Sequence, residues 1–389
     1  MATSTLGDLT EAIPLLDDNG SGVYNKGRNT ARDFRMDFIA GLFGVGSIST
    51  RPGVLANFWT GNATTGYFVE LRGTAQGTPS RVITVGAGRA FCSRSGQGPY
   101  VMTLETDLNV TMPAADGSLP RIDRVYVLTY DKGSFGSDPD HGPKVIVETG
   151  TPNASPIAPS IPSEAVPIFD VYRRAGSSGD QIAQGDITDK RKGTSLSGTP
   201  RPMLGGDSLA TVGTKHGEQR LRAGNTFVPS GLPVTHLIDT WSAIDGKWHG
   251  TQSMIFTARL TAPGTINNGA TRIGSQIVLP DPGWEYKVSG AGHNRLTVSG
   301  SPGPNLATAH IRVGNTAAPT AHDGTVVAVG VCQAFGSGGY FPIEFGTADN
   351  VFSGSQTVYK LVTNNTGATA TLVGSTDTFD TFTVIMDPA

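Results

Sequence analysis

The sequence predicts a mainly β protein: an N-terminal β-sandwich-like domain with one short helix, an extended Gly/Pro/Ser linker, and a C-terminal antiparallel β-sandwich or jelly roll. The composition supports this prediction, because 52 Gly and 25 Pro in 389 residues, with only 16% charged residues, favour short strands and turns. Strand-like apolar runs recur in both halves. In the second half they are spaced by roughly 10–16 residues, as in sandwiches and jelly rolls.

The length and the shifts in composition predict several units. A chain of 389 residues exceeds one small core, so about two or three domains are expected. We expect a polar N-terminal arm over residues 1–28, a β domain over 29–192, and a second β domain over 234–389. Residues 193–233 are rich in small residues. They indicate a flexible linker in a monomer, or an extended oligomerisation segment in a symmetric fibre.

One helix is expected, over Thr30–Phe43. Thr30 and Asp33 resemble a capping box, and Gly44 follows the last apolar residue. Helical spacing places four apolar residues on one face: Phe34, Phe38, Ile39 and Leu42.

Strands are expected elsewhere. In the first domain the candidates are Tyr67–Arg72, Arg81–Val85, Tyr100–Leu104, Leu108–Met112, Ile122–Tyr130, Lys144–Glu148 and Val166–Tyr172. In the second they are Ser253–Leu260, Gln276–Leu279, Glu285–Val288, Arg295–Val298, Ala309–Val313, Thr325–Val331, Tyr340–Glu344, Gln356–Val362, Ala368–Val373 and Phe379–Met386.

The run from Arg121 to Arg191 is the most informative part of the chain. Three apolar strands are interrupted by Thr151–Pro162, which carries four prolines and favours an extended, polyproline-like path. This segment is interpreted as a surface crossing between two strands or as a docking segment for a neighbouring subunit. Neither face of Ile122–Tyr130 is purely apolar, so both faces are expected to be partly covered.

Residues 30–192 resemble the minor tail, or tail-tip, proteins of siphophages. The resemblance covers about half of the chain, which departs from it in a long Trp59–Pro79 insert. The motifs are an aromatic helix with a Gly-Val turn (Asp33–Val45), a V-x-x-G-x-A strand end (Val85–Ala90), a Gly/Tyr turn (Gly96–Tyr100), an R-I-D strand (Arg121–Val125), a proline hinge (Gly150–Pro159) and a closing I-x-D-x-R (Ile187–Arg191).

The resemblance implies a structural protein of the tail of a long-tailed bacteriophage, found in the virion and contributing to host attachment. The expected partners are other tail proteins, two further copies of the chain in a homotrimer, and a host cell-surface glycan. A purely architectural tail protein without receptor binding is the alternative. A cell-wall glycan hydrolase is a third possibility, although no paired-carboxylate pattern stands out.

Charged residues at the ends of two strands are candidates for a structural clamp. Asp123 can pair with an arginine across the sheet, and such a buried pair positions strands more than it stabilises them. The other candidates are Arg124, Asp189 and Arg191. The alternative interpretation is that all four are exposed charges flanking strands.

Sugar binding is the chemistry that the second half favours, because saccharide sites combine aromatic rings with polar hydrogen-bonding groups. The candidate receptor or glycan residues are Trp241, Asp245, Trp248, Trp284, Tyr286 and Tyr340. The alternative is that the tryptophans pack the entry to the sandwich or a trimer seam.

Other classes of function are not indicated by the sequence. No catalytic motif, cofactor fingerprint or metal-ligand cluster is present, and the net charge of −3 without a dense basic run argues against nucleic-acid binding. No run of about 20 apolar residues indicates a membrane span. The two cysteines, Cys92 and Cys332, are expected to be unpaired thiols in separate cores, with a long-range disulfide as the alternative.

Overall fold

The computed structural model describes residues 51–56, 68–195, 199–224, 226–260, 263–298, 306–314, 324–333, 339–346, 350–373 and 381–389. The chain divides into two compact units, Met1–Gly224 and Asn225–Ala389. Within the described residues, every regular element is a strand apart from two short 3-10 turns, η2 (Gly176–Asp180) and η3 (Gln184–Asp186). The predicted mainly β class is therefore confirmed. The helix predicted over Thr30–Phe43 lies outside the described residues.

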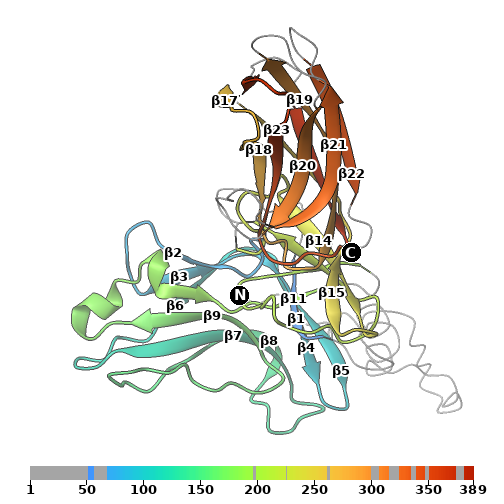
Figure 1. Ribbon diagram of the computed structural model, residues 1–389. Helices are drawn as coiled ribbons and strands as arrows, with labels where there is room; N and C mark the ends of the chain where they lie inside the picture. Colours follow the sequence, from blue (N-terminus) through green and yellow to red (C-terminus); the bar gives the residue numbers. More distant parts are fainter. Residues whose placement is uncertain are drawn as a thin grey trace, which may run out of the picture. The chain divides into compact units, whose positions relative to one another are not determined.

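Three sheets lie wholly within the described residues of the first unit (Figure 1). The first sheet has the order β11 (Gly193–Thr194), β1 (Gly53–Leu55), β4 (Gly88–Arg94), β5 (Gly98–Leu104). The second has the order β10 (Ile187–Asp189), β9 (Val166–Arg173), β7 (Arg121–Asp131), β8 (His141–Glu148). The third has the order β2 (Gly73–Ala75), β3 (Val82–Val85), β6 (Leu108–Thr111).

The core of this unit lies where the three sheets meet. Cys92 and Met102 come from the first sheet, Ile83 from the third, and Val127 and Phe169 from the second, and all belong to one buried cluster. This arrangement is sandwich-like, because the apolar faces of separate sheets cover one another.

Both faces of β7 are covered, as its mixed pattern indicated. Val125 and Val127 point into the main core, whereas Tyr126 and Leu128 belong to a second, smaller buried cluster. Ile161, from the proline-rich segment, packs against this second cluster. The segment 151–162 therefore runs as a crossing over the outer face of the second sheet.

The first part of the segment expected to be a linker is folded into the first unit. The strand β11 pairs with β1, and β12 (Arg201–Pro202) pairs with β13 (Gln219–Ala223) in parallel. Glu218 bonds to Arg51 at 2.7 Å, and Arg201 bonds to Asp207 at 2.7 Å. These ion pairs and the backbone pairing hold residues 199–224 in place, although the segment contains few apolar residues.

The second unit has the strand order of a jelly roll. One sheet runs β16 (Met254–Arg259), β25 (Thr381–Pro388), β19 (Tyr286–Val298), β22 (Gly339–Gly346). The other runs β18 (Thr271–Leu279), β23 (Gln356–Asn364), β20 (Leu306–Gly314), β21 (Thr325–Gln333). When only the eight strands of these two sheets are numbered along the chain, from β16 as 1 to β25 as 8, the two orders are 1-8-3-6 and 2-7-4-5. These orders are those of the double Greek key of a jelly roll.

Short strands complete this unit. They are the hairpin β14 (His236–Ser242) and β15 (Lys247–Gly250), and the pair β17 (Gly264–Ile266) and β24 (Ala370–Leu372), of which β24 extends the pairing along β19. The jelly-roll core is mainly apolar, and it also contains a buried lysine. Lys360 donates a hydrogen bond to the carbonyl of His293 at 2.8 Å and lies 5.2 Å from the ring centre of Phe382.

The strand predictions differ from the structure in three informative ways. Tyr67–Arg72 is not a strand where it is described: Arg72 donates its amide to the carbonyl of Val69, and Leu71 has a positive φ of 54° in the turn between them. The strand β4 was not predicted, because Gly86 and Gly88 at its start resemble a turn. The separate strands predicted over Glu285–Val288 and Arg295–Val298 are one continuous strand, β19.

Candidate functional site

Asp123 lies at the centre of a buried charge cluster. Its carboxylate accepts hydrogen bonds from Nε and Nη2 of Arg121, at 2.7 and 3.2 Å, and from Arg173 at 3.3 Å. The amide of Gly150 donates to the same carboxylate at 3.0 Å. A Cβ at Gly150 would lie 2.0 Å from the carbonyl oxygen of Ile122, so only glycine allows this close approach. The cluster joins β7, β9 and the start of the proline-rich segment.

Arg191 forms a second clamp. Its guanidinium bonds twice to the carboxylate of Asp189, at 3.0 and 2.6 Å, and its remaining nitrogen donates to the carbonyls of Phe68 and Glu70 at 3.1 and 2.6 Å. Arg191, which ends the run from Arg121 to Arg191, is thereby attached to the turn before β2. Backbone carbonyls and a carboxylate satisfy the donors of a buried guanidinium, as its fork geometry requires.

Arg124 holds the proline-rich segment. It forms a two-bond ion pair with Asp170 on β9, at 2.7 and 2.9 Å, and donates to the carbonyl of Pro159 at 3.1 Å. The hydrogen bonds with Asp170 raise the pKa of Arg124, so this guanidinium stays charged at any ordinary pH. Near this anchor, the side chain of Ile157 is 81% exposed.

Three of the candidate glycan residues lie together on the β14–β15 hairpin. Trp241 and Trp248 are directly opposite each other, with ring centres 5.3 Å apart. Trp241 is buried, Trp248 is half-buried, and Asp245 is exposed at the turn. Asp245 bonds to Nε2 of His249 at 2.8 Å. Hydrogen bonds from Ser242 and His249 lower the pKa of Asp245, so this exposed carboxylate is an acceptor at neutral pH.

The structure places the other candidate rings differently. Trp284 and Tyr286 are buried in the jelly-roll core, with ring centres 6.4 Å apart, and the Tyr286 hydroxyl donates to the carbonyl of Gly354 at 2.9 Å. A Cβ at Gly250 would lie 2.3 Å from the Trp284 ring, so this ring is packed against backbone. Neither ring is accessible for stacking on a sugar. Tyr340 lies on β22, and its side chain is outside the described residues.

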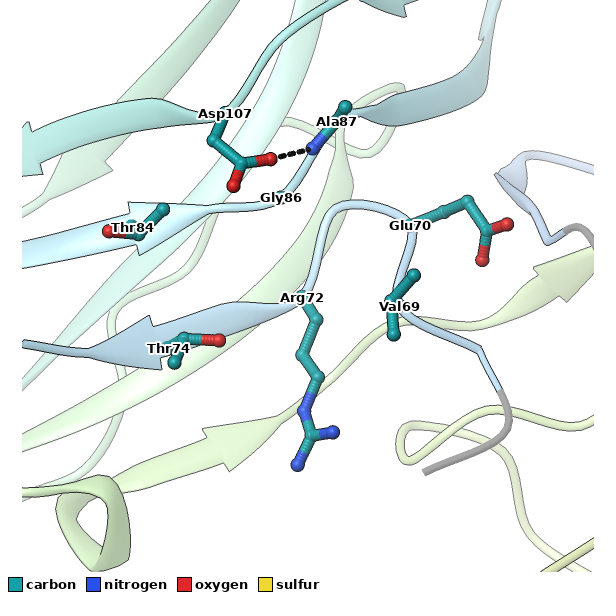
Figure 2. Close-up of a pocket in the computed structure, with 8 residues that line it drawn as sticks. All are labelled: Val69, Glu70, Arg72, Thr74, Thr84, Gly86, Ala87 and Asp107. Atoms are coloured by element: carbon teal, nitrogen blue, oxygen red, sulfur yellow. Dashed lines mark hydrogen bonds between the residues drawn. The ribbon is translucent and has the colours of Figure 1, made fainter. Parts of the chain in front are cut away.

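Sequence reasoning missed an open pocket of about 500 Å³ in the first unit (Figure 2). It lies beside the third sheet, where the turn before β2 meets the turns before β4 and β6. Asp107 accepts a hydrogen bond from the amide of Ala87 at 2.9 Å and fixes one wall. The lining residues are Val69, Glu70, Arg72, Thr74, Thr84, Gly86, Ala87 and Asp107.

The pocket is suited to hydrogen-bond acceptors and small apolar groups. Within the described residues, the Arg72 guanidinium forms no hydrogen bond or ion pair, so its donors are available. Figure 2 shows the Glu70 carboxylate on the opposite side of the turn from this guanidinium. The carbon-bearing walls come from Val69, Ala87 and the two threonines, and no aromatic ring lines the pocket. It therefore lacks the stacking surface of a typical sugar site. No signal in the sequence distinguishes Arg72 from other arginines.

Among the described residues, no group of three His, Cys, Asp or Glu side chains could hold a metal ion. No helix within those ranges is long and apolar enough to cross a membrane. Cys92 is a free, buried thiol; the side chain of Cys332 is outside the described residues.

Comparison with known proteins gives only weak similarities. No protein-family model matches the sequence, and no curated protein is significantly similar to it. Infectious bursal disease virus, Gx strain, matches at 11% identity and a TM-score of 0.21, over 80% of this chain and 73% of that chain. The VP2 subviral particle of the same virus matches at 11% identity and 0.16, over 91% and 84%. The Cry4Aa toxin of Bacillus thuringiensis matches at 10% and 0.16, over 82% and 51%. These TM-scores do not establish a shared fold.

Proposed function

We propose that this chain is a structural protein of a virion, and specifically of the tail of a long-tailed bacteriophage. The supporting observation is the role of the motif residues that resemble siphophage tail-tip proteins. Asp123, Asp189 and Arg191 are used in hydrogen-bonded clamps that connect strands. Motifs that serve only to hold strands together fit a part whose function is to be built into a larger assembly.

The first unit is the anchoring part in this proposal. Its clamps connect strands of the second sheet to the proline-rich segment and to the turn before β2. The proline-rich segment is fixed over the outer face of that second sheet. The second unit would contact the host surface or a neighbouring protein. Jelly rolls occur in both capsid and lectin domains, so the fold is compatible with either role. The proposal assigns no catalytic activity to either unit.

Host attachment is the finer proposal, and the β14–β15 hairpin is its most accessible part. Ile244 is 89% exposed at the tip, and the half-buried Trp248 lies beside the exposed Asp245. The alternative is a purely architectural protein. The burial of Trp241, Trp284 and Tyr286 favours this alternative, because three of the six candidate glycan residues pack the protein itself.

Competition for adsorption tests the attachment role. Purified full-length protein in excess is expected to block adsorption of the parent virus to its host if the second unit binds a receptor. The variants Trp248→Ala and Asp245→Ala are expected to block less well, whereas Thr257→Ala, an exposed residue on β16, is expected to act like the unaltered protein. Equal blocking by all variants would show that the hairpin does not contribute to receptor binding. No blocking by the unaltered protein would favour the architectural role.

A further inference from the structure

The exposed isoleucine of the proline-rich segment and the Arg72 pocket suit each other in shape and chemistry. Ile157 is held between fixed points: the Asn153 amide donates to the carbonyl of Pro120 at 2.9 Å, and the Pro159 carbonyl accepts from Arg124 at 3.1 Å. An apolar side chain on an ordered segment loses little further freedom when it binds. Such a side chain is a candidate anchor for a protein–protein contact.

The segment offers acceptors rather than donors. Residues 149–163 carry no charged side chain, and prolines at 152, 156, 159 and 162 lack an amide donor. A polyproline-like path leaves its carbonyl groups without internal hydrogen bonds. A complementary site must therefore supply hydrogen-bond donors and a small apolar hollow.

The Arg72 pocket supplies both features. The guanidinium of Arg72 offers donors that no other described residue uses, and carbon atoms of Val69, Thr74 and Ala87 provide apolar walls. A volume of about 500 Å³ accommodates an isoleucine with its neighbouring residues. The absence of aromatic rings disfavours a sugar there but does not disfavour an extended peptide.

The segment cannot reach this pocket within its own molecule. It is fixed over the outer face of the second sheet by Arg124 and Ile161, whereas the pocket lies beside the third sheet. We propose that residues Ser155–Pro159 of one copy bind in the Arg72 pocket of a second copy of this chain, with Ile157 in the hollow. The contact is heterologous, since different surfaces meet, and three such contacts can close a ring.

This inference deepens the proposed function, because it names a partner of the anchoring unit, and it does not depend on receptor binding. Sedimentation of the full-length chain tests it. The unaltered protein is expected to form a closed oligomer. Ile157→Asp is expected to sediment as a monomer, and Ile157→Ser to weaken each contact about tenfold to hundredfold. Ile244→Asp, at an isoleucine that is 89% exposed on the hairpin, is the matched control and is expected to leave the oligomer intact.

A mixing experiment separates this contact from all others. Arg72→Glu removes the donors of the pocket, and Thr74→Trp fills its space. Both substitutions leave the proline-rich segment unchanged, and each is expected to give monomers. In an equal mixture of the two kinds of variant, the Ile157→Asp chain supplies an unaltered pocket and the pocket variant supplies an unaltered segment. One contact can therefore form, and the mixture is expected to give dimers and nothing larger. Monomers in that mixture, an unaltered protein that stays monomeric, or an Ile157→Asp protein that still forms the full oligomer would each overturn the inference. If the unaltered protein is monomeric, a second copy does not fill the Arg72 pocket, and another virion protein becomes the candidate occupant.

Discussion

Asp123 and Arg173 form a fully buried ion pair between neighbouring strands, with 3.3 Å between Oδ2 and Nη1 and no side-chain exposure on either residue. Burial lowers the pKa of Arg173, and the charge of Asp123 opposes this effect. Both charges have left water, so the pair depends on its additional hydrogen bonds from Arg121 and Gly150. The pair fixes how β7 and β9 are joined to the proline-rich segment.

Asp123→Ala is expected to destabilise the first unit by about 3–5 kcal/mol, because the buried guanidinium groups of Arg121 and Arg173 each lose a carboxylate partner. Arg173 keeps its second ion pair, with Asp180. The measurement is urea unfolding with thiol labelling of Cys92, a probe confined to this unit, in a Cys332→Ser chain. Asp140→Ala is the control, since Asp140 is 61% exposed in its pair with Lys144 and its loss is expected to leave the unfolding midpoint nearly unchanged. Equal effects of the two variants would contradict the structural role of the cluster.

The slow reaction of Cys92 with thiol reagents in the folded chain is a separate prediction. Burial raises the pKa of Cys92 to about 12. The reactive thiolate is then nearly absent at neutral pH, and the side chain is also inaccessible. Cys92 is expected to resist thiol reagents in the folded chain and to react at once when the chain is unfolded in urea. Rapid labelling in the absence of denaturant would show that this core opens readily.

Residues 199–224 are expected to be required for the stability of the first unit. Glu218 pairs with Arg51 at 2.7 Å and accepts hydrogen bonds from the amide and hydroxyl of Thr214. Glu218→Gln is expected to cost about 3 kcal/mol by the Cys92 assay, because it leaves a largely buried guanidinium without its charge partner. Glu105→Gln, on an exposed side chain, provides the comparison. An unchanged unfolding midpoint for Glu218→Gln would restore the interpretation of this segment as a free linker.

Acid is expected to weaken the first unit through Asp138. Burial alone raises the pKa of Asp138, but hydrogen bonds from Arg94 and from the amide of Asp131 outweigh burial and lower it. A carboxyl group with a lowered pKa in the folded state stabilises the fold above its ordinary pKa of about 3.9. This contribution is lost as the pH falls through the lower, folded value.

Asp138→Asn removes that titration. Unfolding midpoints measured between neutral pH and about pH 3 are therefore expected to fall more steeply for the unaltered chain than for the variant, and the two are expected to converge in acid. Parallel pH profiles would show that Asp138 does not contribute to acid sensitivity.

Much of the fold was predictable from local patterns. The apolar, β-branched and aromatic residues of Ile122–Tyr130 and of the regular runs in the second half predicted β7 and most of the jelly roll, because such runs between turn signals favour strands. The short strands β11, β12 and β13 were missed, since they are only two to five residues long and are held by pairing with distant strands and by ion pairs such as Arg201–Asp207. Such long-range pairing leaves no periodic signal in the sequence.

The candidate sites were harder to predict. Trp241, Asp245 and Trp248 are close together because a two-stranded hairpin connects them, which is a local feature. Tyr286 was an equally reasonable candidate, but its burial follows from the packing of two sheets. The Arg72 pocket forms where turns distant in sequence meet, and its recognition needs the three-dimensional structure.

The most direct test of the proposed function is to locate this chain in the particle. An antibody raised against the full-length protein would be bound to purified virions of the parent virus and visualised by electron microscopy. Label is expected at the end of the tail, in a symmetric arrangement. Label on the capsid, or no label on intact virions that are shown to adsorb to their host, would contradict it.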